Sequence, residues 1–291
     1  MKKTAVAIGN FDGFHRGHQR IILELVEVAK KINLIPVVLT FSSHPVSWLD
    51  SSLLTTEEQK RKLFKRYKVK IYRLNFVSIY HFQPGEFVRK ILVKKLNADC
   101  VVIGENFRFG YLRKGSATTL KELGEKYNFQ VKIVPLLKEK GETISSGYVR
   151  KLLREGNLEM AKSLLGRAYE VQGKVIPGAS RGKELGFPTA NLEVDSRVLL
   201  PQGVFIAKIQ ENNHEYQGVA NIGIRPTFPG NSIPRAEVHL LSLSKRLYRK
   251  KLNLLLLKRI RPEKKFPSPL ILQKQIEKDI EYAKNFFLKK R

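Results

Sequence analysis

Ten residues, 9–18, combine two histidines with three glycines and read G-N-F-D-G-F-H-R-G-H. An apolar run precedes them and apolar residues at helical spacing follow, which predicts a strand, a tight turn and a helix. The N–H groups at a helix N-terminus attract phosphate, and glycines let a polyphosphate approach the backbone closely. His15 and His18 lie three residues apart, so on a first helical turn both would face one triphosphate.

Two plainer interpretations compete with a phosphate site at this turn. A glycine-rich turn after a strand is often only a chain crossing, but two closely spaced histidines in a turn are hard to explain as packing. An H-x-x-H pair can also supply two zinc ligands, yet the single cysteine, Cys100, lies far along the chain and no further ligand cluster is near. We therefore favour nucleotide phosphate over a metal ion.

A second candidate phosphate contact lies at a predicted helix start, where residues 145–150 read S-S-G-Y-V-R. Ser145 and Ser146 would cap the helix and offer hydroxyl groups to phosphate. Arg150, about one turn further on, would reach forward with its guanidinium group. The alternative is a capped helix without a ligand.

A third anion site is indicated in the second half, where residues 178–191 read G-A-S-R-G-K-E-L-G-F-P-T-A-N. The glycines leave backbone N–H groups free to surround an anion, and Thr189 and Asn191 alternate onto one side. The G-K-S/T of a Walker loop is missing, so a plain surface hairpin is the alternative. The residues expected around the phosphates are Gly178, Arg181, Gly182, Lys183, Gly186, Thr189 and Asn191.

Length and composition indicate a globular, cytoplasmic protein. The 291 residues suffice for two domains with separate cores, and 42% of them are hydrophobic. The start Met-Lys-Lys is followed by too short an apolar run for a signal peptide, and no stretch approaches the roughly 18 apolar residues of a membrane span. One cysteine excludes an intramolecular disulfide. We expect no membrane partner.

The formal net charge of +28 raises the question of nucleic-acid binding. Lysine and arginine are spread along the chain, and their runs do not alternate with aromatic residues as a base-stacking surface would. We interpret most of these runs as solvated faces and favour compositional bias over specific nucleic-acid binding. Anionic substrates would benefit from the field in either case.

In the first half, apolar runs alternate with amphipathic segments. The predicted strands after the first cover residues 35–41, 70–76, 100–104 and 130–135, and the predicted helices cover 55–67, 84–96 and 118–127. This alternation indicates an α/β fold, a doubly wound Rossmann-like parallel sheet whose ligands bind beyond the carboxyl ends of the strands. The turn at 9–18 and the loop at 105–110 fall at that edge.

Near residue 160 the pattern changes to short strands separated by turns. We place a domain boundary there, with one domain over residues 1–160 and another over 161–291. Five predicted strands indicate a small antiparallel β-barrel, and they cover residues 169–176, 203–209, 215–222, 236–243 and 252–260. The amphipathic segment 270–287 is expected to be a helix that packs on this barrel.

The first motif resembles a known family signature. The pattern G-x-F-D-G-x-H-x-G-H is similar to that of the HxGH nucleotidyltransferases, in particular the bacterial bifunctional riboflavin kinase/FAD synthetases, and the stretches 40–45, 104–110 and 145–150 extend the resemblance. The resemblance implies that ATP contacts Gly9, Phe11, Asp12, Gly13, His15, Gly17, His18, Ser145, Ser146 and Arg150. It implies a flavin site at His44, Asn106, Phe107 and Arg108. Phe107 and Phe109, at a spacing of two, are equally open to interpretation as core residues.

The second motif resembles the riboflavin kinase signature, with Lys183 where arginine is common. This resemblance implies that Thr189 and Asn191 contact Mg²⁺ and nucleotide. It also implies that Glu237 is the catalytic base that accepts the proton of the attacking alcohol. A solvated edge-strand glutamate is the alternative for Glu237. The residues from 242 to 249 depart from the family pattern.

Together the two motif sets predict a bifunctional enzyme. The barrel would use ATP and Mg²⁺ to phosphorylate riboflavin to FMN, and the first domain would join FMN to the α-phosphorus of a second ATP, releasing pyrophosphate and giving FAD. The FMN phosphate is already ionised, so no base is needed there, and His15, His18, Ser146 and Arg150 are expected to stabilise charge on the triphosphate. The expected partners are these small molecules, and weak homo-oligomers are allowed.

Three rival hypotheses remain open. The adenylyl half could have lost activity, because Ser43, Asn106 and Gly147 all depart from the family pattern on its loops. A nucleotidyltransferase for another substrate would share the first motif but not the second. A basic RNA-binding protein on the same scaffold would bind RNA in a salt-sensitive way and turn over no riboflavin.

Overall fold

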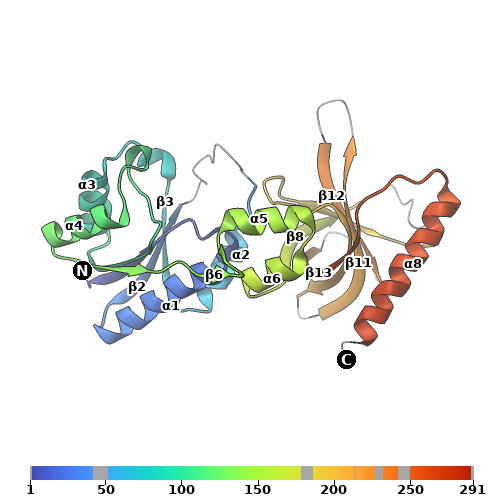
Figure 1. Cartoon of the computed structure of the whole chain (residues 1–291), viewed down its shortest axis with the longest axis horizontal. Coiled ribbons are helices and arrows are strands. Elements are labelled where there is room, and N and C mark those ends of the chain that lie inside the picture. Colours follow the sequence, from blue (N-terminus) through green and yellow to red (C-terminus); the bar gives the residue numbers. More distant parts are fainter. Residues whose placement is uncertain are drawn as a thin grey trace. The chain divides into compact units, whose positions relative to one another are not determined.

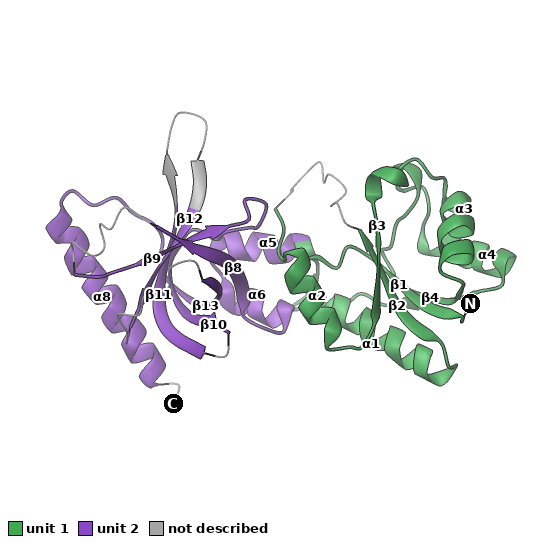
Figure 2. Cartoon of the chain, turned by 180° about the vertical axis from the view of Figure 1, so that it is seen from behind, with its two compact units in different colours: residues 1–146 green, residues 147–291 purple. Residues whose placement is uncertain are grey.

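The computed structural model describes residues 2–41, 52–177, 186–212, 214–226, 232–241 and 250–289. The chain forms two compact units, residues 1–146 and 147–291, which Figure 2 colours separately. The predicted boundary after residue 160 falls inside α6 (Leu158–Leu165), a helix of the second unit that packs on the barrel strands. The predicted division into a first functional domain, residues 1–160, and a second one, residues 161–291, stays a prediction.

The first unit is built on a five-stranded parallel sheet, as the alternating pattern predicted. Its strands are β1 (Thr4–Ile8), β2 (Ile35–Phe41), β3 (Lys70–Leu74), β4 (Ala98–Gly104) and β5 (Gln130–Val134), in the order β3-β2-β1-β4-β5. The chain proceeds from β1 to one side through β2 and β3, and then to the other side through β4 and β5. The carboxyl end of β1 is therefore a topological switch point, where open α/β sheets bind ligands.

Helices cover both faces of this sheet (Figure 1). One face packs on α1 (Arg16–Lys31) and α2 (Glu57–Lys65), and the other on α3 (Pro84–Phe87), η3 (Val88–Lys95) and α4 (Ala117–Tyr127). The helix expected over 84–96 continues as a π-helix through η3, where the Leu96 N–H donates to the carbonyl five residues back, Ile91, at 3.0 Å. A capping box between Thr56 and Gln59 begins α2.

The second unit is a closed barrel of six antiparallel strands in the order β10-β11-β12-β9-β8-β13. The strands are β8 (Tyr169–Ile176), β9 (Ala190–Val194), β10 (Gly203–Glu211), β11 (His214–Pro226), β12 (Ser232–Leu240) and β13 (Lys251–Arg261). The predicted barrel is confirmed, but the prediction of five strands is wrong. The missing strand is the short β9, which directly follows the glycine-rich segment and was not predicted as a strand of its own.

The C-terminal helix α8 (Pro269–Leu288) packs on this barrel, as predicted. Ile280, Ala283 and Phe287 are buried against side chains of β10 and β11. The buried carboxylate of Asp279 accepts from Arg261 Nη2 of β13 at 2.9 Å, which fixes the helix to the strand. The remaining short elements are η1 (Asp12–Phe14), η2 (Phe76–Ser78), η4 (Tyr111–Arg113), β6 (Lys138–Glu139), β7 (Glu142–Thr143) and α5 (Ser146–Glu155). Across the described ranges, every helix is too short or too polar to cross a membrane.

Candidate functional site

The turn after β1 is a tight, buried crossing into α1. Phe11 and Phe14 adopt positive φ angles of 51° and 43°, and Gly13 adopts 75°. A Cβ atom on Gly13 would lie 2.7 Å from Leu54 Cδ1, so this position requires glycine for its space as well as for its angle. The two phenylalanine rings meet Phe64 of α2 edge to face, at 5.6 and 5.2 Å, and hold the turn from beneath.

Asp12 fastens this turn to the chain just before α2. Its buried carboxylate accepts from Leu54 N at 3.0 Å and from Thr55 N and Oγ1 at 3.1 and 3.2 Å. The Thr55 hydroxyl in turn accepts from Gly13 N at 3.0 Å. The Asp12 carbonyl accepts from Ser146 Oγ at 2.9 Å. These bonds give Asp12 and Ser146 a part in building the turn, and their contact with ATP stays a prediction.

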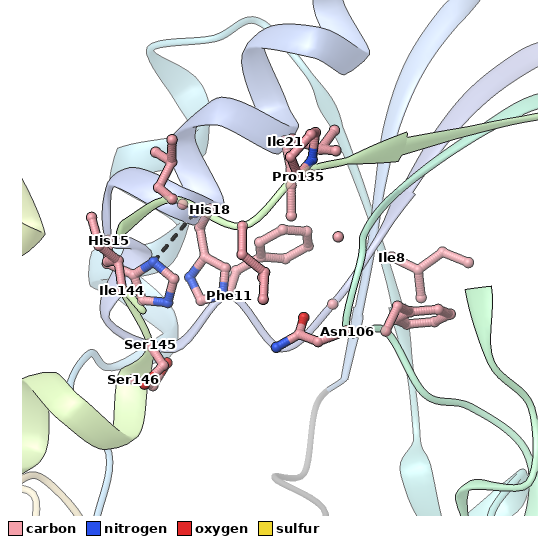
Figure 3. A pocket seen from close by; sticks show the side chains of 17 residues that line it. Ile8, Phe11, His15, His18, Ile21, Asn106, Pro135, Ile144, Ser145 and Ser146 are labelled. Atoms are coloured by element: carbon pink, nitrogen blue, oxygen red, sulfur yellow. Dashed lines mark hydrogen bonds between the residues drawn. The ribbon is translucent and has the colours of Figure 1, made fainter. Parts of the chain in front are cut away.

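His15 caps helix α1. Its Nδ1 accepts the His18 N–H at 3.3 Å, which is the dashed line in Figure 3. An accepting Nδ1 carries no proton, so the ring is neutral and its proton is on Nε2. The two imidazoles stack, with centroids 3.7 Å apart and planes inclined by 19°. Gly17 lies against them, because an added Cβ would come within 3.2 Å of the His15 ring.

His18 is buried at the same helix start. Burial lowers the pKa of His18 well below its ordinary value of 6.5, the positive charge of the nearby Lys60 lowers it further, and a proton on His15 would add to that effect. Its Nδ1 has no hydrogen-bond partner among the residues that the structure describes. The Phe11 ring meets the His18 imidazole edge to face, with ring centroids 5.3 Å apart. At neutral pH this turn therefore presents two uncharged histidines.

A pocket of about 260 Å³ opens at this point, at the carboxyl ends of β1, β4 and β5. Asn106 faces the histidines across it in Figure 3. Of the predicted residues, the structure places Gly9, Phe11, His15, Gly17, His18, Asn106, Phe107, Ser145 and Ser146 around this one pocket. Their convergence from segments far apart in the sequence agrees with a ligand site at the switch point.

The other residues predicted for this site lie elsewhere. Asp12 and Gly13 form the base of the turn, and Arg108 is exposed beside the pocket loop. Arg150 is buried on α5 in the second unit. His44 lies outside the described residues.

Phe107 and Phe109, in the loop after β4, have different environments. Phe109 is buried in the core between the sheet and the helices α3 and α4. Phe107 is half-buried, stacks on Phe109 with centroids 5.5 Å apart, and lines the pocket. Phe107 is thus available to a planar ligand, whereas Phe109 supports it from the core.

Lys60 is a buried residue beside the turn that was not predicted from the sequence, where it falls in a run of cations interpreted as a solvated face. Lys60 is 5% exposed and forms an ion pair with Glu57. Its Nζ lies 3.5 Å from the carbonyl of Asn10 in the histidine turn. The only sequence signal is that Lys60 shares a helix face with the apolar Phe64, four residues on.

The barrel brings together predicted residues from two separate motifs. Glu237 of β12 is the direct cross-strand partner of Asn191 of β9 and of Asn221 of β11. Cross-strand partners share a face of the sheet, and the neighbours Ala236 and Val238 are buried inside the barrel. The carboxylate and the two amides therefore belong to the outward face.

Thr189 and Gly186 precede β9 on the same segment. Thr189 is two residues before Asn191 and half-buried, and Gly186 adopts a positive φ of 88° with open space around it. The remaining residues predicted for the phosphate loop, Gly178, Arg181, Gly182 and Lys183, lie outside the described residues.

Comparisons with known proteins divide the chain in the same order as the motifs. The family described as FAD synthetase matches residues 1–148, and the family described as riboflavin kinase matches residues 165–287. A bifunctional riboflavin kinase/FMN adenylyltransferase of Buchnera aphidicola subsp. Schizaphis graminum is 38% identical, over 98% of this chain and 94% of its own. The protein of that description from Escherichia coli K12 is 34% identical, over 97% and 92%.

A solved structure from Streptococcus pneumoniae, described as a macrolide-efflux protein, has a TM-score of 0.88 at 30% identity, covering 98% of this chain and 94% of that one. Fold and site together define a nucleotidyltransferase unit followed by a riboflavin kinase barrel. The chain belongs to the family of bifunctional riboflavin kinase/FMN adenylyltransferases.

Replacing Gly13 by alanine tests the tight turn. The left-handed backbone alone costs an L-residue about 1–2 kcal/mol, and the contact with Leu54 adds to that cost. We expect Gly13→Ala to lower the free energy of unfolding of the first unit and the rate of FAD formation. Gly141→Ala is the matched control, since Gly141 has a φ of 85° but no atom within 4 Å of an added Cβ. Equal losses in the two variants, measured by denaturant unfolding, would show that packing against Leu54 contributes nothing.

The protonation of His18 can be measured directly by NMR. At pH 6.5 an unperturbed histidine is half-protonated, and we expect the ring of His18 to be neutral there because its pKa is lowered. The unfolded chain takes up this proton first as the pH falls below 6.5, so the free energy of unfolding decreases in that range. A His18→Gln variant, which also assigns the resonance, should lose this part of the decrease. A half-protonated His18 at pH 6.5 would contradict the assignment.

Proposed function

We propose that the histidine pocket of the first unit adenylylates FMN and that the outward face of the barrel around Glu237 phosphorylates riboflavin. The chain is an enzyme with riboflavin kinase and FMN adenylyltransferase activities, in keeping with its family. The observation that carries the first assignment is the pair of stacked, uncharged histidines at a switch-point pocket. The register that pairs Glu237 with Asn191 supports the second.

In the first pocket, an FMN phosphate oxygen attacks the α-phosphorus of ATP. A new P–O bond forms as the bond to the β-phosphate oxygen breaks, and pyrophosphate leaves. The attacking phosphate is already ionised, so catalysis rests on alignment and on donors that stabilise negative charge. His15 supplies its Nε2–H, the start of α1 supplies backbone N–H groups, and His18 adds a further donor. Ser146, whose hydroxyl proton is donated to the Asp12 carbonyl, holds the turn in place, and a contact of Arg150 with the triphosphate belongs to the same proposal.

On the barrel face, the 5′-hydroxyl of riboflavin attacks the γ-phosphorus of ATP and ADP leaves. Glu237 accepts the hydroxyl proton as the new P–O bond forms. The Thr189 hydroxyl and the Asn191 amide offer the oxygen ligands that Mg²⁺ prefers, beside a carboxylate, so the residues present fit this ion. Bound Mg²⁺ would offset charge on the phosphates, and the segment from Gly178 to Gly186 would surround them.

The same proposal includes the flavin contacts, the compartment and the partners of the protein. His44, Asn106, Phe107 and Arg108 would hold the flavin of the first pocket, with Phe107 against its ring. We propose a cytoplasmic enzyme whose partners are small molecules, with at most weak self-association and without a nucleic-acid partner. The high charge then reflects composition and favours anionic substrates through the long-range field.

Two variants should separate the activities in the whole chain. His18→Ala should slow FAD formation from FMN by about 100- to 1,000-fold, the usual effect of losing one preorganised donor, and leave FMN formation unchanged. Glu237→Gln should slow FMN formation by about 100- to 10,000-fold, as expected for a lost general base, while supplied FMN is still converted to FAD. Both reactions are followed by separating the flavins after incubation with Mg-ATP.

Circular dichroism of each variant shows whether it is folded. Loss of both activities in one folded variant would overturn the assignment of two sites. If wild-type protein accumulates FMN and makes no FAD, the first unit lacks adenylyltransferase activity. Tight, salt-sensitive RNA binding without turnover of riboflavin would favour the RNA-binding alternative.

A further inference from the structure

His239 joins the catalytic strand of the barrel to the segment that carries Thr189. It lies two residues after Glu237 on β12, so the two side chains belong to the same outward face. Its Nδ1 lies 3.0 Å from the carbonyl oxygen of Pro188. A carbonyl only accepts, so the proton of this bond is on Nδ1 of His239, and in the neutral ring Nε2 is the acceptor.

The position of this bond matters because the strand ladder stops just short of it. The pairing between β12 and β9 runs from Ala236 with Leu192 to Val238 with Ala190. Thr189 is therefore one residue beyond the paired strand. The hydrogen bond from His239 to the Pro188 carbonyl lies beyond the last paired residue of β9, next to Thr189, the residue of the proposed metal contact.

Phe187 fixes the other side of the same segment. Its ring packs against the apolar cluster beneath α8, which includes Val204 and Phe287. It also meets the His239 imidazole edge to face, with centroids 5.9 Å apart. The segment 187–189 is thus held by an aromatic side chain at one end and by a hydrogen bond to its carbonyl in the middle.

We propose that His239 is a positioning residue for riboflavin phosphorylation, whose Nδ1–H holds the Pro188 carbonyl and thereby sets Thr189 beside Glu237 and its strand partner Asn191. This inference rests on the proposed kinase function of that face. His239 itself is not expected to touch a reacting atom. Displacements of about 1 Å at a catalytic group can cost roughly 100-fold in rate, so loss of the bond should reduce turnover as well as nucleotide affinity.

Three substitutions of His239 in the whole chain test the hydrogen bond separately from the packing. Asparagine places an amide N–H close to where Nδ1–H stands, glutamine places it one bond further out, and leucine keeps bulk against Phe187 without a donor. We expect His239→Leu to lower kcat/KM for Mg-ATP in FMN formation by about 10- to 100-fold. His239→Asn should stay within about threefold of wild type, and His239→Gln should fall between them.

Three controls make the outcome decisive. FAD formation from supplied FMN should be unchanged in all His239 variants, and their melting temperatures should agree. His214→Leu, on the exposed start of β11, should leave FMN formation unchanged. Thr189→Val tests the site itself: if it has no effect, the proposed kinase site is wrong.

If Thr189→Val slows the kinase and His239→Leu does not, only the role of His239 is overturned. Folded His239→Asn that is as slow as His239→Leu would also overturn it, because the donor would then not matter. Recovery of activity in the asparagine variant alone supports it.

Discussion

The buried carboxylate of Asp12 is the interaction on which the first pocket depends. It accepts from Leu54 and Thr55, while the carbonyl of the same residue accepts from Ser146. One residue thereby joins three segments of the first unit, which are the turn after β1, the chain before α2 and Ser146 at its end. A hydrogen bond to a charged group contributes roughly 1.5–3 kcal/mol, and a buried carboxylate without partners is strongly unfavourable. These hydrogen bonds therefore stabilise the conformation of the turn.

That fixed turn explains how the protein tolerates an unusual backbone beside the pocket. Phe11 and Phe14 both adopt positive φ angles, which are costly for residues with a side chain. Both rings are about 1% exposed and pack edge to face on Phe64. Their burial offsets the backbone cost. The aromatic residues of the motif thus hold the turn from the core side, and the histidines face the pocket.

Much of this arrangement could be predicted from the sequence, for identifiable reasons. Parallel strands that are buried on both faces appear in a sequence as short apolar runs. The sheet and its ligand-binding edge could therefore be predicted. The role of Asp12 was not, because its partners lie in a different segment and nothing local distinguishes a carboxylate facing phosphate from one facing backbone N–H groups. The strand β9 could not be predicted either, because its five residues directly follow a glycine-rich loop. The burial of Lys60 was also not predictable, because its contacts include Asn10, which lies in a different segment, as well as Glu57.

The uncharged state of the histidines has a consequence for how the first pocket would receive ATP. Burial keeps the proton off His18 in the free protein, although the chain as a whole is strongly cationic. A triphosphate placed beside the ring favours the protonated form and therefore raises the pKa of His18. By linkage, proton uptake on binding strengthens ATP affinity as the pH falls between the free and bound pKa values. In the proposed ATP complex, a positive charge on His18 would develop beside the phosphates, whereas the free protein avoids a buried cation at this position.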